Sequence, residues 1–125
     1  MGIKGANIED EETAKTYVFG ETTIWWDYTP AEHGGDLASI SYSRISTKDD
    51  GTSSTYYGGP ETISSNNSSY GDGVSGLSKS TLKYTITFTD EYNQTYTTGP
   101  YTIEKLDAPT VEITGITGST PVPPI

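Results

Sequence analysis

The segment from Thr81 to Glu104 alternates between apolar and polar residues almost without interruption. In its first half the large apolar side chains occupy every second position, and threonine or lysine fills the positions between them. A period of two predicts a β-strand with one buried face and one solvated face. The polar stretch Asp90–Gln94 predicts a reversal, after which Thr95–Glu104 returns as a second strand. The segment therefore predicts a β-hairpin, and with it an antiparallel all-β fold.

Shorter segments before the hairpin also carry strand patterns. An edge strand is expected within the Ser-, Asn- and Gly-rich stretch Glu61–Gly76, and Lys48–Gly51 (KDDG) predicts a tight turn. The other expected strands are Thr13–Phe19, Thr22–Thr29, Leu37–Ile45 and Thr52–Tyr57. Six to eight short strands without a useful helix predict a β-sandwich or a small barrel. The side chains expected to form its core are Ile24, Trp26, Ile40, Tyr42, Leu82, Tyr84, Ile86 and Phe88.

The supply of aliphatic residues is small for a chain of 125 residues, which is the size of one domain. Val, Ile, Leu and Phe are fewer than about one residue in five, the level below which disorder becomes a serious alternative. Ten tyrosines and two tryptophans offset this shortage, because each buries a large apolar area. We therefore expect an N-terminal arm over residues 1–12, a folded domain over residues 13–106 and an extended, proline-rich tail or linker over residues 107–125. Neighbours in an assembly are expected to add stability.

The chain carries a formal net charge of −10, from 17 acidic and 7 basic residues. An acidic surface repels phosphate, so the composition argues against nucleic acids and anionic membranes as partners. Without cysteine the chain forms neither disulfides nor thiolate metal sites. No apolar run reaches the roughly 18 residues of a membrane span. The opening Met1–Lys4 is not followed by the apolar stretch of a secretory signal, so either a leader has been removed or the protein is not exported by that route. Virion proteins released by cell lysis fit the second alternative.

Thr23–Asp27 (TIWWD) places a tryptophan pair on an expected strand, and Gly76–Leu77 is followed by Thr81–Tyr84 (TLKY) at the start of the hairpin. The hairpin itself runs through Tyr84–Asp90 (YTITFTD) toward Asn93. These three segments resemble, in turn, the second strand, the stretch that leads into the sixth strand, and the final hairpin of one family. That family is the immunoglobulin-like superfamily, in its fibronectin type III and polycystic-kidney-disease-type branches.

The resemblance implies a single immunoglobulin-like antiparallel β-sandwich over about Thr13 to Glu104. It also implies that Tyr84 is a corner tyrosine whose hydroxyl bonds to nearby backbone. Modules of this family serve as adhesin stalk domains, as spacers in secreted enzymes, and as decorations on phage heads and tails. The fold by itself does not select among these roles.

The sequence offers no convincing set of catalytic residues. His33, the only histidine, lies in the loop Pro30–Asp36 beside two glycines, where solvation is a simpler interpretation than a role as base or metal ligand. A Lys–Asn isopeptide bond, as formed in some sandwich adhesins, would use Lys15 or Lys83 with Asn93. These residues fall at polar strand positions and in a turn. We therefore expect a protein that is not an enzyme and needs no cofactor.

Acidic residues at expected turns are the candidate metal ligands. Calcium takes several oxygen ligands, which the loops between the strands of a sandwich can supply. No spacing here matches a calcium-binding loop, so solvated turn residues are the simpler interpretation. The weak candidates for calcium are Asp49, Asp50, Asp72 and Asp90.

Adjacent aromatic residues are the candidate binding groups. Trp25 and Trp26 are neighbours on one expected strand, so their side chains point to opposite faces. Tyr56 and Tyr57 form a second such pair. A ring on the outer face of a strand can be covered by the arm or the tail, be buried in an interface, or stay exposed and stack on a sugar. Coverage is the preferred interpretation, and a glycan-binding platform is the alternative.

These observations favour a non-enzymatic structural or interaction module that is displayed on an exterior surface. A virion component, such as a phage decoration protein, is the first hypothesis. A cell-surface adhesin, filament or spacer module of a larger secreted protein is the second, and a carbohydrate-binding module is the third. The expected partners are protein chains, through self-assembly or in a larger surface or virion assembly, with a glycan as a further candidate. The expected location is the virion surface or the extracellular side of a cell surface.

Overall fold

The computed structural model describes residues 2–4, 8–10, 15–64, 68–107 and 109–115. Within these ranges the chain forms nine strands and no helix, which confirms the prediction of an all-β protein. The strands are β1 (Gly2–Lys4), β2 (Ile8–Asp10), β3 (Lys15–Val18), β4 (Glu21–Trp25), β5 (Leu37–Thr47), β6 (Ser53–Thr62), β7 (Ser69–Gly73), β8 (Ser80–Asp90) and β9 (Thr95–Lys105).

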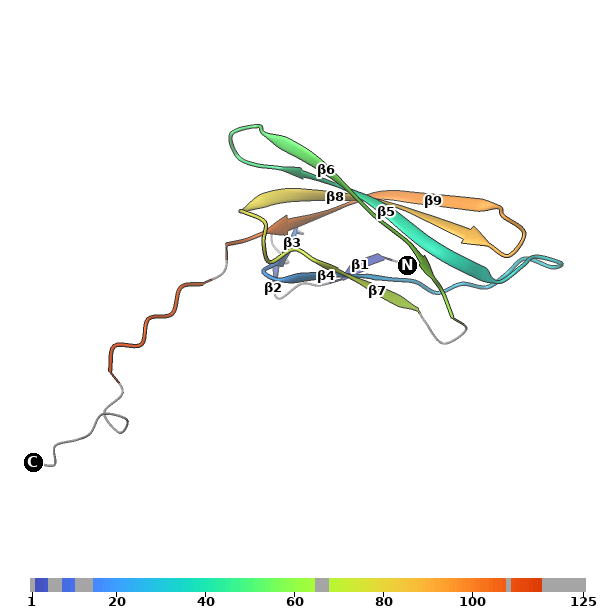
Figure 1. Ribbon diagram of the computed structural model, residues 1–125, viewed down its shortest axis with the longest axis horizontal. Coiled ribbons are helices and arrows are strands. Elements are labelled where there is room, and N and C mark those ends of the chain that lie inside the picture. Colours follow the sequence, from blue (N-terminus) through green and yellow to red (C-terminus); the bar gives the residue numbers. More distant parts are fainter. Residues whose placement is uncertain (1, 5–7, 11–14, 65–67, 108, 116–125) are drawn as a thin grey trace, which may run out of the picture.

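Two sheets make up the fold (Figure 1). In the part of the chain that the structure describes, the smaller sheet has the order β1-β4-β7 and the larger has the order β2-β3-β9-β8-β5-β6. Neighbouring strands are antiparallel except β3 and β9, which run parallel. The smaller sheet lies across the larger one, and the sides that face each other enclose the core, as in a β-sandwich.

The core comes from alternate positions along the strands. In β8 every second residue from Ser80 to Asp90 is buried, because the side chains of a strand point to opposite faces in turn. The rings of Trp26 and Phe88 meet edge to face between the sheets, with centroids 5.3 Å apart. The structure buries all eight residues that the sequence placed in the core: Ile24, Trp26, Ile40, Tyr42, Leu82, Tyr84, Ile86 and Phe88.

Two glycine–proline steps interrupt the pairing in the larger sheet. The register of β6 against β5 shifts beside Gly59–Pro60, and that of β9 against β8 shifts beside Gly99–Pro100. Both glycines have a positive φ, 83° and 119°, which suits a β-bulge. A Cβ at either glycine would lie 2.6 Å from a carbonyl oxygen of the neighbouring strand. The bulge explains why β6 continues to Thr62, past the glycines at which the sequence pattern placed its end.

The two ends of the chain behave differently. Residues 1–12, expected as an arm, contribute β1 to the smaller sheet and β2 to the larger, where backbone pairing holds them. Residues 109–115 extend away from the sandwich and join neither sheet. The proline-rich end of the predicted tail, Thr120–Ile125, lies outside the described residues.

Replacing Gly99 by alanine is expected to destabilise the sandwich by about 1–3 kcal/mol. The substitution forces a side chain into a positive φ and presses its Cβ against the Tyr84 carbonyl oxygen. Gly76→Ala is the matched control, because a Cβ there meets nothing within 4 Å and φ lies outside the left-handed range. Urea unfolding followed by tryptophan fluorescence measures both variants. Equal midpoints would contradict the role of the bulge.

Candidate functional site

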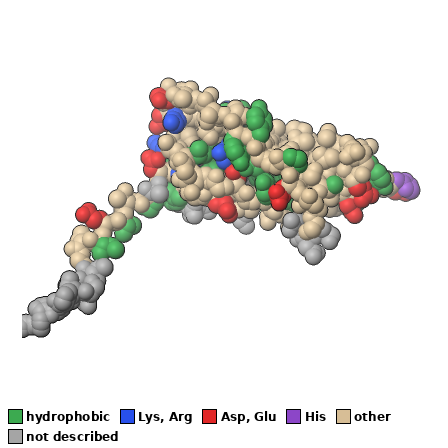
Figure 2. All heavy atoms as spheres, viewed as in Figure 1, with side chains coloured by type: hydrophobic (Ala, Val, Ile, Leu, Met, Phe, Trp, Pro, Cys, Tyr) green, Lys and Arg blue, Asp and Glu red, His purple; other side chains and the backbone are tan. Residues whose placement is uncertain are grey.

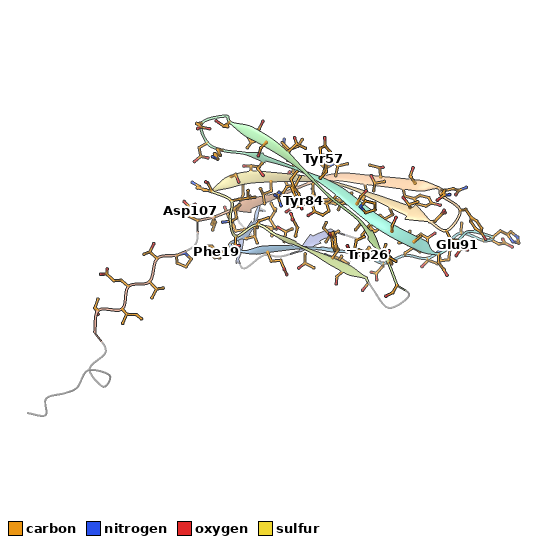
Figure 3. All side chains as sticks on the ribbon, in the orientation of Figure 1. Phe19, Trp26, Tyr57, Tyr84, Glu91 and Asp107 are labelled. Carbon is orange, nitrogen blue, oxygen red and sulfur yellow. The ribbon has the colours of Figure 1, made fainter. Side chains whose placement is uncertain are left out.

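A buried ion pair joins the two sheets. Asp72 of β7 accepts hydrogen bonds on both carboxylate oxygens, each at 2.6 Å. Tyr42 Oη donates to Oδ1, while Arg44 Nη1 and Tyr84 Oη donate to Oδ2. Tyr42 and Arg44 belong to β5 and Tyr84 to β8, and all four residues are at most 7% exposed. One side chain of the smaller sheet thus binds three side chains of the larger sheet. Figure 3 shows Tyr84 in the space between the two sheets.

The strand geometry explains why these groups meet. Alternation along β5 places Arg44 on the same side as Ile40 and Tyr42, and the register sets Arg44 directly opposite Tyr84. The sequence did not lead to a prediction of this pair, since Asp72 was expected only as a weak candidate calcium ligand. The alternation along β5 did contain a signal for it. A period of two places the Arg44 side chain on the buried face, and a buried cation needs an acidic partner.

The Tyr84 hydroxyl corrects one expectation of the family resemblance. It donates to the carboxylate of Asp72, twelve residues earlier in the chain, and not to nearby backbone. A charged acceptor forms a stronger hydrogen bond than a backbone carbonyl does, which favours this partner inside the sandwich.

The surroundings determine the protonation of this Asp–Arg–Tyr network. Burial and then the hydrogen bond to Asp72 raise the pKa of Tyr42 well above its ordinary value of 10.0, and the same two causes raise the pKa of Tyr84. Burial opposes the charge on Arg44, but the hydrogen bond and the charge of Asp72 outweigh it and raise the pKa of Arg44. Both tyrosines therefore keep their protons at neutral pH and act as donors. The network holds the sheets together and does not face solvent.

Two aromatic rings, one from β6 and one from β7, pack against the network. The Tyr42 ring centroid lies 6.1 Å from that of Tyr56 and 5.8 Å from that of Tyr70. The Arg44 guanidinium stacks over Tyr56, 4.6 Å from the ring centroid. Gly58 lies beneath Tyr42, where a Cβ would come within 2.2 Å of the ring. A bare glycine at this position therefore allows Tyr42 to reach Asp72.

Beside these rings, at its β6 edge, the larger sheet extends beyond the smaller one. The hydrogen bonds of Asp72 place β7 over β5 and β8, whereas β6 lies on the far side of β5, and both β6 and β7 are edge strands. Tyr56 faces the same side as Arg44 and is 50% exposed, while Tyr70 is partly buried. We call this half-open pair, Tyr56 and Tyr70, the aromatic strip. Its apolar surface is available to a partner.

The four aromatic residues expected as binding groups do not form one platform. Trp26 is buried in the core, and Trp25 is exposed on the outer side of the smaller sheet. Tyr57 is 76% exposed on the outer side of the larger sheet (Figure 3). Tyr56, its neighbour along the strand, points to the opposite face. A single ligand therefore cannot contact all four rings.

The four aspartates considered for calcium lie at three separate places, because only Asp49 and Asp50 share a turn. Asp49 is near Lys79, with 3.6 Å between Oδ2 and Nζ, and Asp50 accepts a backbone N–H within the same turn. Asp72 belongs to the network, and Asp90 ends β8. In the part of the chain covered by the structure, no three His, Asp or Glu side chains are placed to hold a metal ion.

Asp90 organises the turn between β8 and β9. Its Oδ1 accepts the N–H groups of Tyr92 and Gln94, each at 2.9 Å, and its Oδ2 accepts the Tyr96 hydroxyl at 3.0 Å. Burial acts to raise the pKa of Asp90, but these donors outweigh it and hold the pKa below the ordinary value of 3.8. Asn93, with a positive φ of 61°, completes the turn.

The remaining candidates are His33 and the lysine and asparagine residues considered for an isopeptide bond. His33 is exposed at the tip of the loop between β4 and β5, 3.6 Å from the carboxylate of Glu32 (Figure 2). Lys83 is exposed on β8, whereas Asn93 lies in the β8–β9 turn, so the structure does not bring this pair together. The side chain of Lys15 lies outside the described part of the structure.

A pocket of about 450 Å³ opens at the end of the sandwich that carries the β4–β5 loop. The residues that define its chemistry are apolar side chains and two carboxylates: Trp26, Tyr28, Leu37, Ile63, Asp27 and Asp36. The volume is that of a small-molecule site. Carboxylates beside aromatic rings suit a ligand with hydroxyl groups or a positive charge.

No protein-family model, no curated protein and no solved structure matches this chain. Across the residues described by the structure, no helix has both the length and the apolar character to cross a membrane. The functional interpretation therefore starts from the geometry of the chain itself.

Asp72→Asn keeps the shape of the side chain and removes the charge that neutralises Arg44. Because a buried cation then lacks its partner, we expect the free energy of unfolding to fall by about 3–5 kcal/mol. Asp49→Asn, the control, removes a carboxylate from the exposed pair with Lys79 and should cost less than about 1 kcal/mol. Urea denaturation measures both, and similar losses would show that the network does not hold the sheets together.

Asp90→Asn should destabilise the protein at neutral pH and much less in acid. The folded-state pKa of Asp90 lies below its unfolded value, so the charged carboxylate adds stability above that unfolded value. This contribution is lost as the pH falls from about 3.8 through the lower folded-state pKa. Urea unfolding of both proteins from neutral to strongly acid pH measures the difference. A difference that stays constant with pH would argue against the assignment.

Proposed function

We propose that the protein is a non-enzymatic structural or interaction module, displayed on an exterior surface and joined there to other protein chains. The observation that carries this proposal is the C-terminal arm, which we define as residues 109–115. The arm stands clear of both sheets (Figures 1 and 2), and its Val111 and Ile113 are 84% and 71% exposed. Branched apolar side chains held in water on an extended chain favour a partner that covers them.

The interior of the sandwich supports a structural role. Asp72 directs both of its oxygens to donors of the opposite sheet, and Tyr42, Arg44 and Tyr84 are buried with it. Hydrogen bonds to a charged acceptor have a preferred geometry and hold these side chains in fixed positions, although Arg44 Nε itself has no hydrogen-bond partner among the described residues. A module that presents a fixed surface to its neighbours needs such rigidity.

The strand arrangement supports the family that the sequence resembles. In immunoglobulin-type sandwiches the second and fifth strands share one sheet, and the third, sixth and seventh share the other. Here β4 and β7 are neighbours in the smaller sheet, and β9, β8 and β5 are neighbours in the larger. Among the roles that modules of this family serve, we propose a virion component, such as a phage decoration protein, as the first specific role; the fold alone does not select it. An adhesin, filament or spacer module at a cell surface is the second.

Fractionation of the native source tests this proposal. An antibody against the protein is followed through a density gradient of lysed culture and applied to intact cells. We expect the protein to co-sediment with particles that contain nucleic acid, because a virion component stays bound to them. A signal on intact cells would favour the cell-surface role. Recovery only as a free monomer, with none on particles or cells, would contradict the proposal.

The pocket beside Trp26 favours glycan binding as a second candidate function. Tyr28 and Ile63 provide apolar surface, and the Asp27 and Asp36 carboxylates can accept hydrogen bonds from sugar hydroxyls. Tryptophan fluorescence titrated with a panel of soluble oligosaccharides tests this, and Asp36→Asn should weaken any response. A flat response across the panel removes the candidate.

A further inference from the structure

The C-terminal arm has the pattern of a strand without a sheet. Val111 and Ile113 occupy alternate positions, with Thr110, Glu112 and Thr114 between and beside them. All five residues are exposed, and none of them pairs with a strand of the described chain. An extended segment of this kind forms stable hydrogen bonds by adding to the free edge of a sheet.

The free edge of β7 fits such a strand. β7 spans five residues, Ser69–Gly73, and among the strands that the structure describes it pairs with β4 alone. On its outer side it carries Ser69, Gly71 and Gly73, so no bulky side chain of its own blocks that face. On its inner side Tyr70 points toward the sandwich, and its ring and that of the half-exposed Tyr56 of β6 both pack against the Tyr42 ring. A strand beside β7 would lie opposite β6 and cover the aromatic strip.

We propose that the C-terminal arm of one copy adds to the β7 edge of a second copy. Thr110–Thr114 matches β7 in length, and its period of two allows Val111 and Ile113 to face the aromatic strip while Glu112 stays in water. The added strand becomes the new edge of the smaller sheet and lies across from β6 of the larger sheet. This inference rests on the proposed function and names the partner as the chain itself.

The geometry favours a second copy over the same chain. Asp107 Oδ1 accepts the backbone N–H of Lys79 at 3.0 Å, which anchors the start of the arm at one end of the sandwich. From Asp107 the arm runs away from both sheets (Figures 1 and 3). Every copy carries one arm and one β7 edge, and the contact joins these two different segments. Two copies can exchange arms in a closed dimer, or repetition of the contact can build a chain or a ring of modules.

Charge shapes this association. Each copy has a net charge of −10, and Glu112 would share the outer side of the extended sheet with Glu21 of β4. Salt screens this repulsion, so self-association should strengthen as the salt concentration rises. An association that salt weakens would rest on ion pairs and would contradict the proposed contact.

Cysteine pairing tests the contact directly, since the chain has no cysteine of its own. Copies that carry Val111→Cys or Ile113→Cys are mixed with copies that carry Tyr70→Cys, and the mixture is oxidised. The two arm positions test two possible registers of the arm against β7. We expect a disulfide-linked heterodimer, because neighbouring strands bring inward side chains close together. Tyr57→Cys is the control acceptor. Its position is more exposed and lies on the outer face of the larger sheet, so random collision would favour it.

Sedimentation velocity of the full chain provides a second measurement that leaves Tyr70 intact. We expect association that depends on concentration, weakened about tenfold or more by the double variant Val111→Asn/Ile113→Asn, which removes the buried apolar surface. Glu112→Gln, on the outward side of the arm, should not weaken it. The thermal midpoint of the monomer should be the same for all three proteins, because the arm lies outside the sandwich.

Three results would overturn the proposal. The first is a full-length chain that stays monomeric at all concentrations, and the second is equal cross-linking to Tyr57→Cys and Tyr70→Cys. The third is a chain carrying both Ile113→Cys and Tyr70→Cys that closes on itself as a monomer, which would assign the arm to its own β7 edge. If the native protein co-sediments with particles while purified copies fail to cross-link, the display role stands and the assignment of a second copy is wrong.

Discussion

The contact of Asp72 with Tyr42, Arg44 and Tyr84 determines how the two sheets of this protein sit on each other. Apolar burial is not directional, so a core with few aliphatic residues restrains sliding of the sheets only weakly. The contact is directional, since three donors converge on one carboxylate at 2.6 Å. Separating the buried charges would cost several kcal/mol. This cost disfavours every placement of one sheet on the other in which Asp72 does not contact Arg44.

Other features of the larger sheet follow from this contact. Tyr42 reaches Asp72 by passing over Gly58, and the adjacent bulge at Gly59 then carries β6 onward along β5. Because Asp72 places β7 above β5 and β8, β6 lies beyond the smaller sheet and Tyr56 remains half exposed. The interaction that stabilises the interior thus also leaves an edge strand and an aromatic surface open. The buried network and the aromatic strip are therefore in contact, through the rings of Tyr42, Tyr56 and Tyr70 and through Arg44 over Tyr56.

Much of the fold was predictable, but little of the candidate site was. The alternation in Thr81–Glu104 predicted the long hairpin, because a period of two is a local property of an extended chain. The same rule places Arg44 inward, yet it does not identify a partner 28 residues away on the other sheet. The bulges at Gly59 and Gly99 were also missed, since glycine followed by proline is typical both of the end of a strand and of a bulge within one.

The sequence alone determined the all-β class and the side of each strand on which a residue lies, because side-chain direction alternates with every residue. Only the tertiary structure decided that Asp72 meets Arg44, that Trp25 and Tyr57 lie on opposite faces of the sandwich, and that β7 keeps a free edge. These outcomes depend on which strands become neighbours and on how one sheet lies over the other. Contacts between residues far apart in the chain decide both, and the local sequence pattern does not encode them.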